Sequence, residues 1–469
     1  MKPRALLMVA SALSLAACVG GPPPEVATPV PVLPDSFLFA PEAPVGTALA
    51  QLLPVGDPAF DTLAAQALAS SPTLAEAAAR VEQARAGADR AGAERLPAVG
   101  VEASVTGTRT NPNSFGGSLP TGVSLDTERV SYAANLTTRW DLDLFGRLRA
   151  QERAALARID AADASARAVR SALLAEIAAT VIDWRTLQAR EAEVRNDLGS
   201  AEELARLAGV RERAGIAPGF DRVRAESSSA GSRSRLAALE SERARLLGRL
   251  VTLTAQGGAQ VRSALALGEP VSELPAPPAT LPSALLANRP DVLAAAATLV
   301  AEDAELAATA RRRFPVFDLS GAIGLLAFGI GDVFDSESVV GSLAAAIAGP
   351  LLDFGRVQAE IDGAAAEKRL AFESYRGAVF MALGDAEAGY GLVAAADGEA
   401  AAVAQEAANL QRAARLANTR YEAGLADFLT VLEARRAADA SGERAAAARG
   451  RAQRARVVLW QALGGSELS

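Results

Sequence analysis

The chain contains one unit twice, and this repeat constrains the fold more than any short motif. Each copy holds a long helical stretch, two strand-like segments and more long helix. The motif Phe145-Gly146-Arg147 reappears as Phe354-Gly355-Arg356. At the same separation, Ala214-Gly215-Ile216 is matched by Ala423-Gly424-Leu425. A repeat of this length predicts two halves of equivalent structure.

The first residues carry an export signal. In residues 1–17, Lys2 and Arg4 precede an apolar run that is too short for a stable membrane helix. The run ends in Leu15-Ala16-Ala17-Cys18, which is the pattern of a bacterial lipobox. Cys18 is the only cysteine, so it cannot form an intramolecular disulfide. We expect Cys18 to carry a diacylglycerol and an N-acyl chain; ordinary cleavage beside a chance cysteine is the alternative.

The composition argues against several classes of function. The net charge of −8 does not suggest a nucleic-acid partner. Histidine is absent, which removes the commonest general base and a usual metal ligand. No pair of carboxylates stands in a recognisable catalytic motif. We therefore predict that the chain is not an enzyme, has no metal site, and has no cofactor apart from the lipid on Cys18.

Proline-rich segments divide the chain into predicted domains. Residues 18–58 should form an extended tether behind the lipid. A second proline-rich stretch at 268–282 links the two halves. The predicted repeats are therefore residues 59–267 and residues 283–469.

Each repeat contains a predicted β-hairpin, at about 98–146 and about 315–355. Loops are expected at 111–126 and 329–338, where turn residues gather. No stretch after the leader approaches the ~20 apolar residues of a membrane helix, so strands must make any membrane crossing. Soluble hairpins packed on helices are the alternative. The alternating apolar residues are Val99, Val101, Ala103, Val105, Val130, Tyr132, Ala134 and Leu136, then Phe317, Leu319, Ile323, Leu325, Leu343, Ala345, Ile347 and Leu351.

Two long helices are predicted at 147–209 and 356–423, neither of which contains proline. Each could reach about 90–95 Å at the rise of an α-helix. Apolar side chains recur along them at coiled-coil spacing, which predicts packing against partner helices. These residues are Leu173, Ile177, Val181 and Trp184 in the first helix, and Tyr375, Val379, Leu383, Ala386 and Tyr390 in the second.

The long helices are expected to turn at Gly215 and Gly424, because glycine adopts positive φ without strain. Shorter helices should follow at about 220–256 and 427–463. Glycine pairs at 257–258 and 464–465 are expected to stop them.

Four strands alone would leave two open edges, which a lipid environment does not tolerate. Closing the sheet therefore requires several copies of the chain. The attached helices would then form a second tube beside the strands. The predicted fold class is mainly α with membrane β: a long coiled-coil-like α-helical barrel plus four strands per chain.

At this point the chain resembles the TolC/OprM-type outer-membrane factor family, in its NodT-like lipoprotein branch. The matching features are the lipobox at Cys18, the strand end Trp140–Arg147, its repeat Pro350–Arg356 and the tip sequence Arg420–Arg436. The resemblance implies a homotrimer with a shared twelve-stranded barrel in the lipid of the bacterial outer membrane and an α-helical barrel in the periplasm. It further implies passive export through a channel joined by a periplasmic adaptor to an inner-membrane pump of the resistance-nodulation-division type.

The resemblance also implies a periplasmic gate at the helix tips, and adaptor docking around the turns at Gly215 and Gly424. The chain departs from better-known relatives at Ala426, where some carry a bridging arginine, and at Thr430, where they carry an acid. The residues that match gate positions are Tyr421, Glu433, Arg436 and Asp221.

Three functions remain open on the sequence. The first is the outer-membrane channel of a tripartite efflux system for small molecules. The second is a conduit for metal efflux or type I protein secretion. The third is a structural lipoprotein without a pore, against which the two hairpins argue. The cargo, pump and adaptor stay open because selectivity in such systems lies mainly in the pump.

Overall fold

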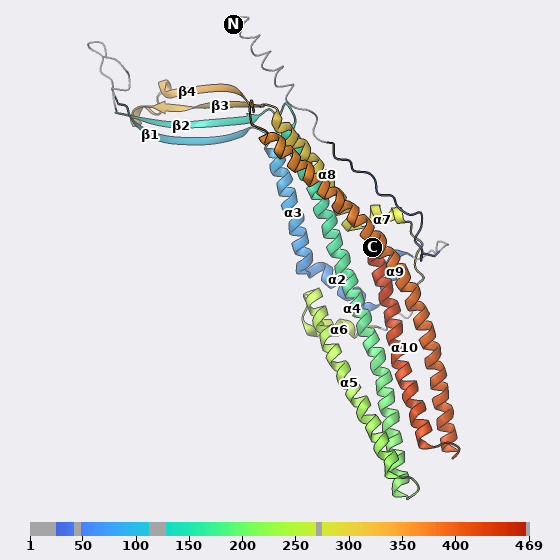
Figure 1. The fold of residues 1–469 in the computed structure, drawn as a ribbon. Coiled ribbons are helices and arrows are strands. Elements are labelled where there is room, and N and C mark those ends of the chain that lie inside the picture. The colour runs from blue at the N-terminus through green and yellow to red at the C-terminus, as the bar shows by residue number, and fades with distance from the viewer. Residues whose placement is uncertain (1–24, 42–47, 112–127, 269–273, 466–469) are drawn as a thin grey trace, which may run out of the picture. The chain divides into compact units, whose positions relative to one another are not determined.

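The computed structural model describes residues 25–41, 48–111, 128–268 and 274–465. The predicted signal peptide, Cys18 and most of the first predicted loop lie outside these residues. The elements, labelled in Figure 1, are η1 (Leu49–Leu52), α2 (Pro58–Ser70), α3 (Pro72–Ala93), β1 (Ala98–Arg109), β2 (Glu128–Asp141), α4 (Arg147–Arg213), α5 (Gly219–Thr254), α6 (Gly258–Leu265), α7 (Pro282–Asn288), α8 (Pro290–Ala310), η3 (Arg311–Arg313), β3 (Val316–Ala327), η4 (Ile330–Asp332), η5 (Ser336–Ser338), β4 (Val339–Ala348), α9 (Arg356–Glu422) and α10 (Phe428–Ala462). The predicted fold class, long helices with four strands, is confirmed.

The chain forms two compact units, and the strands belong to the unit built from residues 82–160 and 296–373. The sheet is antiparallel throughout, in the order β1-β2-β3-β4, and Figure 1 shows the strands side by side. Val101 pairs with Leu136, and Leu136 pairs with Ile323. Residues directly opposite one another share a face of a sheet. The apolar rows predicted for the two hairpins therefore combine into one face.

Two details of the second hairpin differ from the expectation. Strand β4 ends at Ala348, so Leu351 lies beyond it and is 92% exposed. The strand stops there because Gly349 is followed by Pro350, which has no N–H to donate to a ladder. The loop at 329–338 is also not irregular throughout, since it contains the short helices η4 and η5.

The repeated Phe-Gly-Arg motif joins strand to helix differently in the two copies. Phe354 adopts a left-handed φ of 53°, whereas Phe145 is not in that region and stacks on Phe314 with ring centroids 4.8 Å apart. In both copies an aspartate accepts hydrogen bonds from the first backbone N–H groups of the helix: Asp143 from Leu148 at 2.9 Å, and Asp353 from Val357 at 3.0 Å. The same sequence motif thus begins α4 and α9 through different backbone geometry.

The second unit comprises residues 30–81, 161–295 and 374–469, and contains the helix tips. Its main core is built from α2, α4, α9 and α10 with the short helices around them. Most residues predicted to line the coiled-coil contacts are buried there, with Ile177, Val181, Ala386 and Tyr390 at most 1% exposed. Tyr390 also donates a hydrogen bond to the carbonyl of Pro278 at 2.7 Å, which satisfies its hydroxyl in the core.

Helix α9 qualifies the expectation that only strands could cross a membrane. Among the described residues it is the single unbroken helix with a window of 18 residues at mean hydropathy 1.2 and at most two charges, and 33% of that window is buried. Helix α9 also supplies Val379 and Tyr390 to the main core. Packing between helices accounts for apolar residues on this helix.

One glycine prediction is wrong and one is confirmed. Helix α5 is ended by Ala255 with a φ of 53°, while Gly257 has an ordinary negative φ and precedes α6. At the end of α10, Gly464 and Gly465 have φ values of 106° and 58°, as their predicted role requires.

Candidate membrane face and periplasmic gate

The sheet has one apolar and one polar face. On the apolar face, Val101 is 81% exposed and Leu343 is 78% exposed. The opposite face carries Glu102, Asn135 and Ser320, which alternate with the apolar residues along their strands. Exposed apolar area of this extent marks a surface that meets lipid or another protein. Strands β1 and β4 form the two edges of the sheet and have no second strand partner among the described residues.

Both helix hairpins turn through a glycine of positive φ. Gly215 has a φ of 73°, and Ile216 donates its N–H to the carbonyl of Arg211 at 3.0 Å. Gly424 has a φ of 74°, and Leu425 donates to the carbonyl of Arg420 at 2.7 Å. Each turn thus satisfies a carbonyl at the end of a long helix. The predicted turn positions are confirmed, but docking of an adaptor there stays a prediction.

A small apolar cluster joins the tips of the two hairpins within one chain. Its centre is Phe428, the first residue of α10, which is 7% exposed. The other buried members are Leu204, Ala208, Ala225, Val431 and Leu432, from α4, α5 and α10. Burying these side chains stabilises the contact between hairpins through the hydrophobic effect.

Tyr421 packs against this cluster and also contacts the other hairpin. Its ring meets that of Phe428 edge to face, with centroids 6.2 Å apart. The guanidinium carbon of Arg211 lies 5.0 Å from the Tyr421 ring centroid, a cation–π contact between α4 and α9. Arg211 Nε is buried and has no hydrogen-bond partner among the described residues. Sequence reasoning missed Arg211; its position four residues before Gly215, like Arg420 before Gly424, is the signal that could have identified it.

The other predicted gate residues are not brought together in a single chain. Glu433 is exposed and Asp221 half-buried, and the side chain of neither forms a hydrogen bond or ion pair with any described residue. Arg436 is exposed, and its Nε donates to Ser228 Oγ of α5 at 3.4 Å. The side chains of Glu433 and Asp221 are therefore available to groups outside the chain.

The departure at Thr430 has a local structural consequence. Asp427 is the N-cap of α10 and accepts the Thr430 N–H at 2.7 Å. The Thr430 side-chain hydroxyl and then its backbone N–H stabilise the carboxylate, which lowers the pKa of Asp427. Thr430 thus takes part in capping α10 in this chain.

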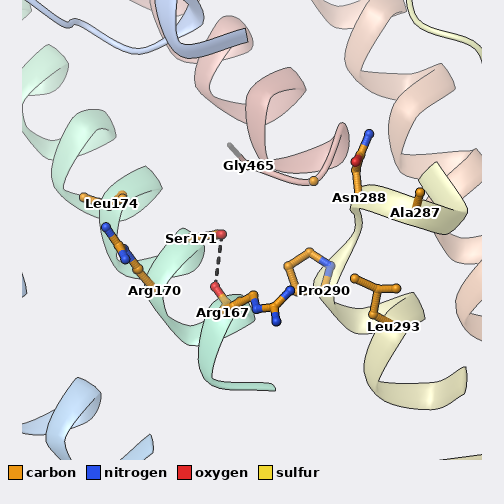
Figure 2. Close-up of a pocket in the computed structure, with 10 residues that line it drawn as sticks. Arg167, Arg170, Ser171, Leu174, Ala287, Asn288, Pro290, Leu293 and Gly465 are labelled. Atoms are coloured by element: carbon orange, nitrogen blue, oxygen red, sulfur yellow. Dashed lines mark hydrogen bonds between the residues drawn. The ribbon is translucent and has the colours of Figure 1, made fainter. Parts of the chain in front are cut away.

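A cavity of about 260 Å³ lies elsewhere in the second unit, lined by parts of α4, the junction of α7 and α8, and the end of α10. Figure 2 shows Arg167, Ser171, Asn288 and Gly465 around it. None of the predicted gate residues lines this cavity, so the gate and the cavity are separate features.

Comparison with known proteins places these features in a family. The model of the family described as outer membrane efflux protein matches residues 63–256 and 281–465. The pyoverdine export outer membrane protein OpmQ of Pseudomonas aeruginosa is 32% identical over 413 residues, covering 87% of this chain and 86% of that protein. The toluene efflux pump outer membrane protein TtgI of Pseudomonas putida is 29% identical over 412 residues, with 87% and 86% covered.

The fold agrees with a solved channel of similar sequence. The structure of the outer-membrane channel OprN matches with a TM-score of 0.83 at 27% identity, covering 96% of this chain and 99% of the other. The family match spans both halves of the chain and leaves out only its ends and the link between them. The chain belongs to the outer membrane efflux protein family, whose members act as efflux channels in the outer membrane.

Proposed function

We propose that three copies of this chain close their sheets into one barrel and form the outer-membrane channel of a tripartite efflux system. The open edges of β1 and β4, together with the apolar face between them, carry this proposal. A sheet with that face in lipid must pair its edges, because unpaired backbone groups cost several kcal/mol each there. Pairing β1 of one copy with β4 of the next satisfies both edges without a second kind of protein.

The ends of such a channel would have different partners. Lipidation of Cys18 would anchor each copy to the outer membrane beside the barrel. The helix tips expose Ile216, Phe220 and Leu425, which are between 64% and 69% exposed. Apolar side chains at turns between long helices suit docking of a periplasmic adaptor, which would connect the channel to an inner-membrane pump of the resistance-nodulation-division type. The cargo would be small molecules, as the names of the pyoverdine and toluene relatives suggest.

The helix tips would gate the channel. Around a three-fold axis, Glu433 from each copy would converge, and three carboxylates would repel one another and attract cations. Asp221 and Arg436 would supply links between neighbouring tips. Within each copy, Arg211 stacked on Tyr421 would hold the two hairpins together, in place of the arginine that Ala426 replaces.

The function is tested by ethidium accumulation in live cells with and without the gene, at unchanged pump energy. We expect deletion to raise accumulation and the wild-type gene to restore it. No change would contradict small-molecule efflux and favour metal or protein export. Purified protein in planar bilayers provides the second arm: Glu433→Ala should raise conductance, because it removes the converging charges. Glu422→Ala, at an exposed carboxylate of the same tip, is the matched control, and equal conductance in both variants would remove Glu433 from the gate.

A further inference from the structure

Above the tips, α4 and α10 run antiparallel in close contact. Arg454 donates to Asp183 at 2.6 Å, and further along Arg190 donates to Glu443 at 2.9 Å. Small residues allow this approach: a Cβ on Gly442 would lie 2.8 Å from Glu193 Oε2. These contacts fix a register in which successive positions of α4 meet successive positions of α10. In both of these charged pairs, a cation faces an anion.

The next position along this register is different, because Asp197 of α4 meets Asp439 of α10. The two side chains hydrogen-bond to each other. Asp197 is 5% exposed and is already an acceptor twice over, from Ser232 Oγ at 2.5 Å and from Arg235 Nη2. A carboxylate can only accept hydrogen bonds, so a bond between two carboxyl groups requires that one of them carries a proton.

Every charged group around Asp439 has been assigned a partner. From α5, Arg235 faces Asp197, and Ser232 bonds to the same carboxylate. From α10 itself, Arg435 donates to Ser200 at 3.4 Å and to Asn418 of α9 at 3.0 Å. Burial, and then the bond to Asp197, raise the pKa of Asp439 to about 8 against the opposing effect of Arg435 and Arg235. Asp439 is therefore the group that holds the proton near neutral pH.

We propose that Asp197 and Asp439 share one proton that clasps α4 to α10, and that losing it loosens the helix tips and opens the periplasmic end of the channel. The channel part rests on the function proposed above. The sign follows from the raised pKa: the stabilisation is complete below the ordinary pKa of a carboxyl group and is lost as pH rises through about 8. Once both groups are ionised, two buried like charges repel across the helix contact. The clasp is closed at neutral pH and released in alkali.

The first experiment measures conductance of the full-length protein in planar bilayers between about pH 6.5 and about pH 9. Wild-type conductance should rise over this range. The variant Asp439→Asn should stay low throughout, because its amide donates to Asp197 at every pH. Glu406→Gln, at an exposed carboxylate that pairs α9 with Arg444, should keep the wild-type rise. A flat wild-type profile, or the same rise in Asp439→Asn, would overturn the proposal.

A stability measurement separates the clasp from the channel. Thermal unfolding followed by helix circular dichroism should show a lower Tm for the wild type at about pH 9 than at about pH 6.5. In Asp439→Asn this difference should be lost. If Asp439→Asn does not assemble, Asp197→Asn replaces it, since either substitution removes the carboxyl pair. Absence of conductance at every pH with a pH-dependent Tm would reject the channel function and retain the clasp, whereas a pH-independent wild-type Tm would reject the clasp.

Discussion

Compared with the α4–α5 tip, the α9–α10 tip buries far more of its apolar surface, although both turn through a glycine with nearly the same φ. The first aromatic residue after the turn is 64% exposed in the first tip, at Phe220, and 7% exposed in the second, at Phe428. Only the second tip places its aromatic side chain in the cluster shared between hairpins.

The polar contacts differ in the same direction. In the second tip, Asp427 caps α10 with its side chain. In the first, Pro218 precedes α5 without a side-chain cap, and Arg222 instead pairs with Glu212 at 2.7 Å and with Glu226 at 2.8 Å. One backbone turn can thus be stabilised by burial and capping or by exposed ion pairs. The second arrangement leaves apolar side chains exposed, which suits a surface that binds a partner.

The largest effect is expected from removing the aromatic side chain of the buried tip. Phe428→Ala should lower the free energy of unfolding by about 3–5 kcal/mol, because it removes a core ring and leaves a cavity. Phe220→Ala should have little effect on folding, since that ring is mostly exposed. Chemical denaturation of the two purified variants measures this difference, and equal losses would contradict the comparison.

Gly424→Ala and Gly215→Ala test what the two tips share. Each should cost about 1–2 kcal/mol, because alanine is strained at a left-handed φ. The two costs should be alike, since a Cβ at either position has no atom within 4 Å. Thermal unfolding measures both variants. A cost in one tip alone would show that surrounding contacts, rather than backbone strain, set the penalty.

The smallest effects should come from the polar groups and should differ in their response to salt and acid. Arg222→Ala should weaken the first tip mainly at low salt, because exposed ion pairs are screened. Asp427→Ala should weaken the second tip at neutral pH. Because the pKa of Asp427 is lowered, its stabilisation exists above the ordinary carboxyl pKa and is lost as pH falls through the lowered value. Hydrogen exchange at the tip amides measures both, and a salt response from Asp427→Ala alone would reverse the assignment.

Several features were predictable because their signals are local. The coiled-coil spacing, the absence of proline from the long helices and the turn glycines predicted α4, α5, α9 and α10 to within a few residues. The alternating residues predicted the strands, and the proline at position 350 explains the one strand end that was misplaced. Ala255 was missed because alanine carries no sequence signal for a left-handed φ.

Tertiary structure decided which distant residues meet. The sequence by itself determined the repeat, the helices and the turns, since each depends on neighbours along the chain. The pairing of β2 with β3, the stacking of Arg211 on Tyr421 and the meeting of Asp197 with Asp439 all depend on how separate elements align. A carboxylate on a helix reads as an ordinary solvated side chain until packing sets another opposite it, because its charge is costly only once water is removed.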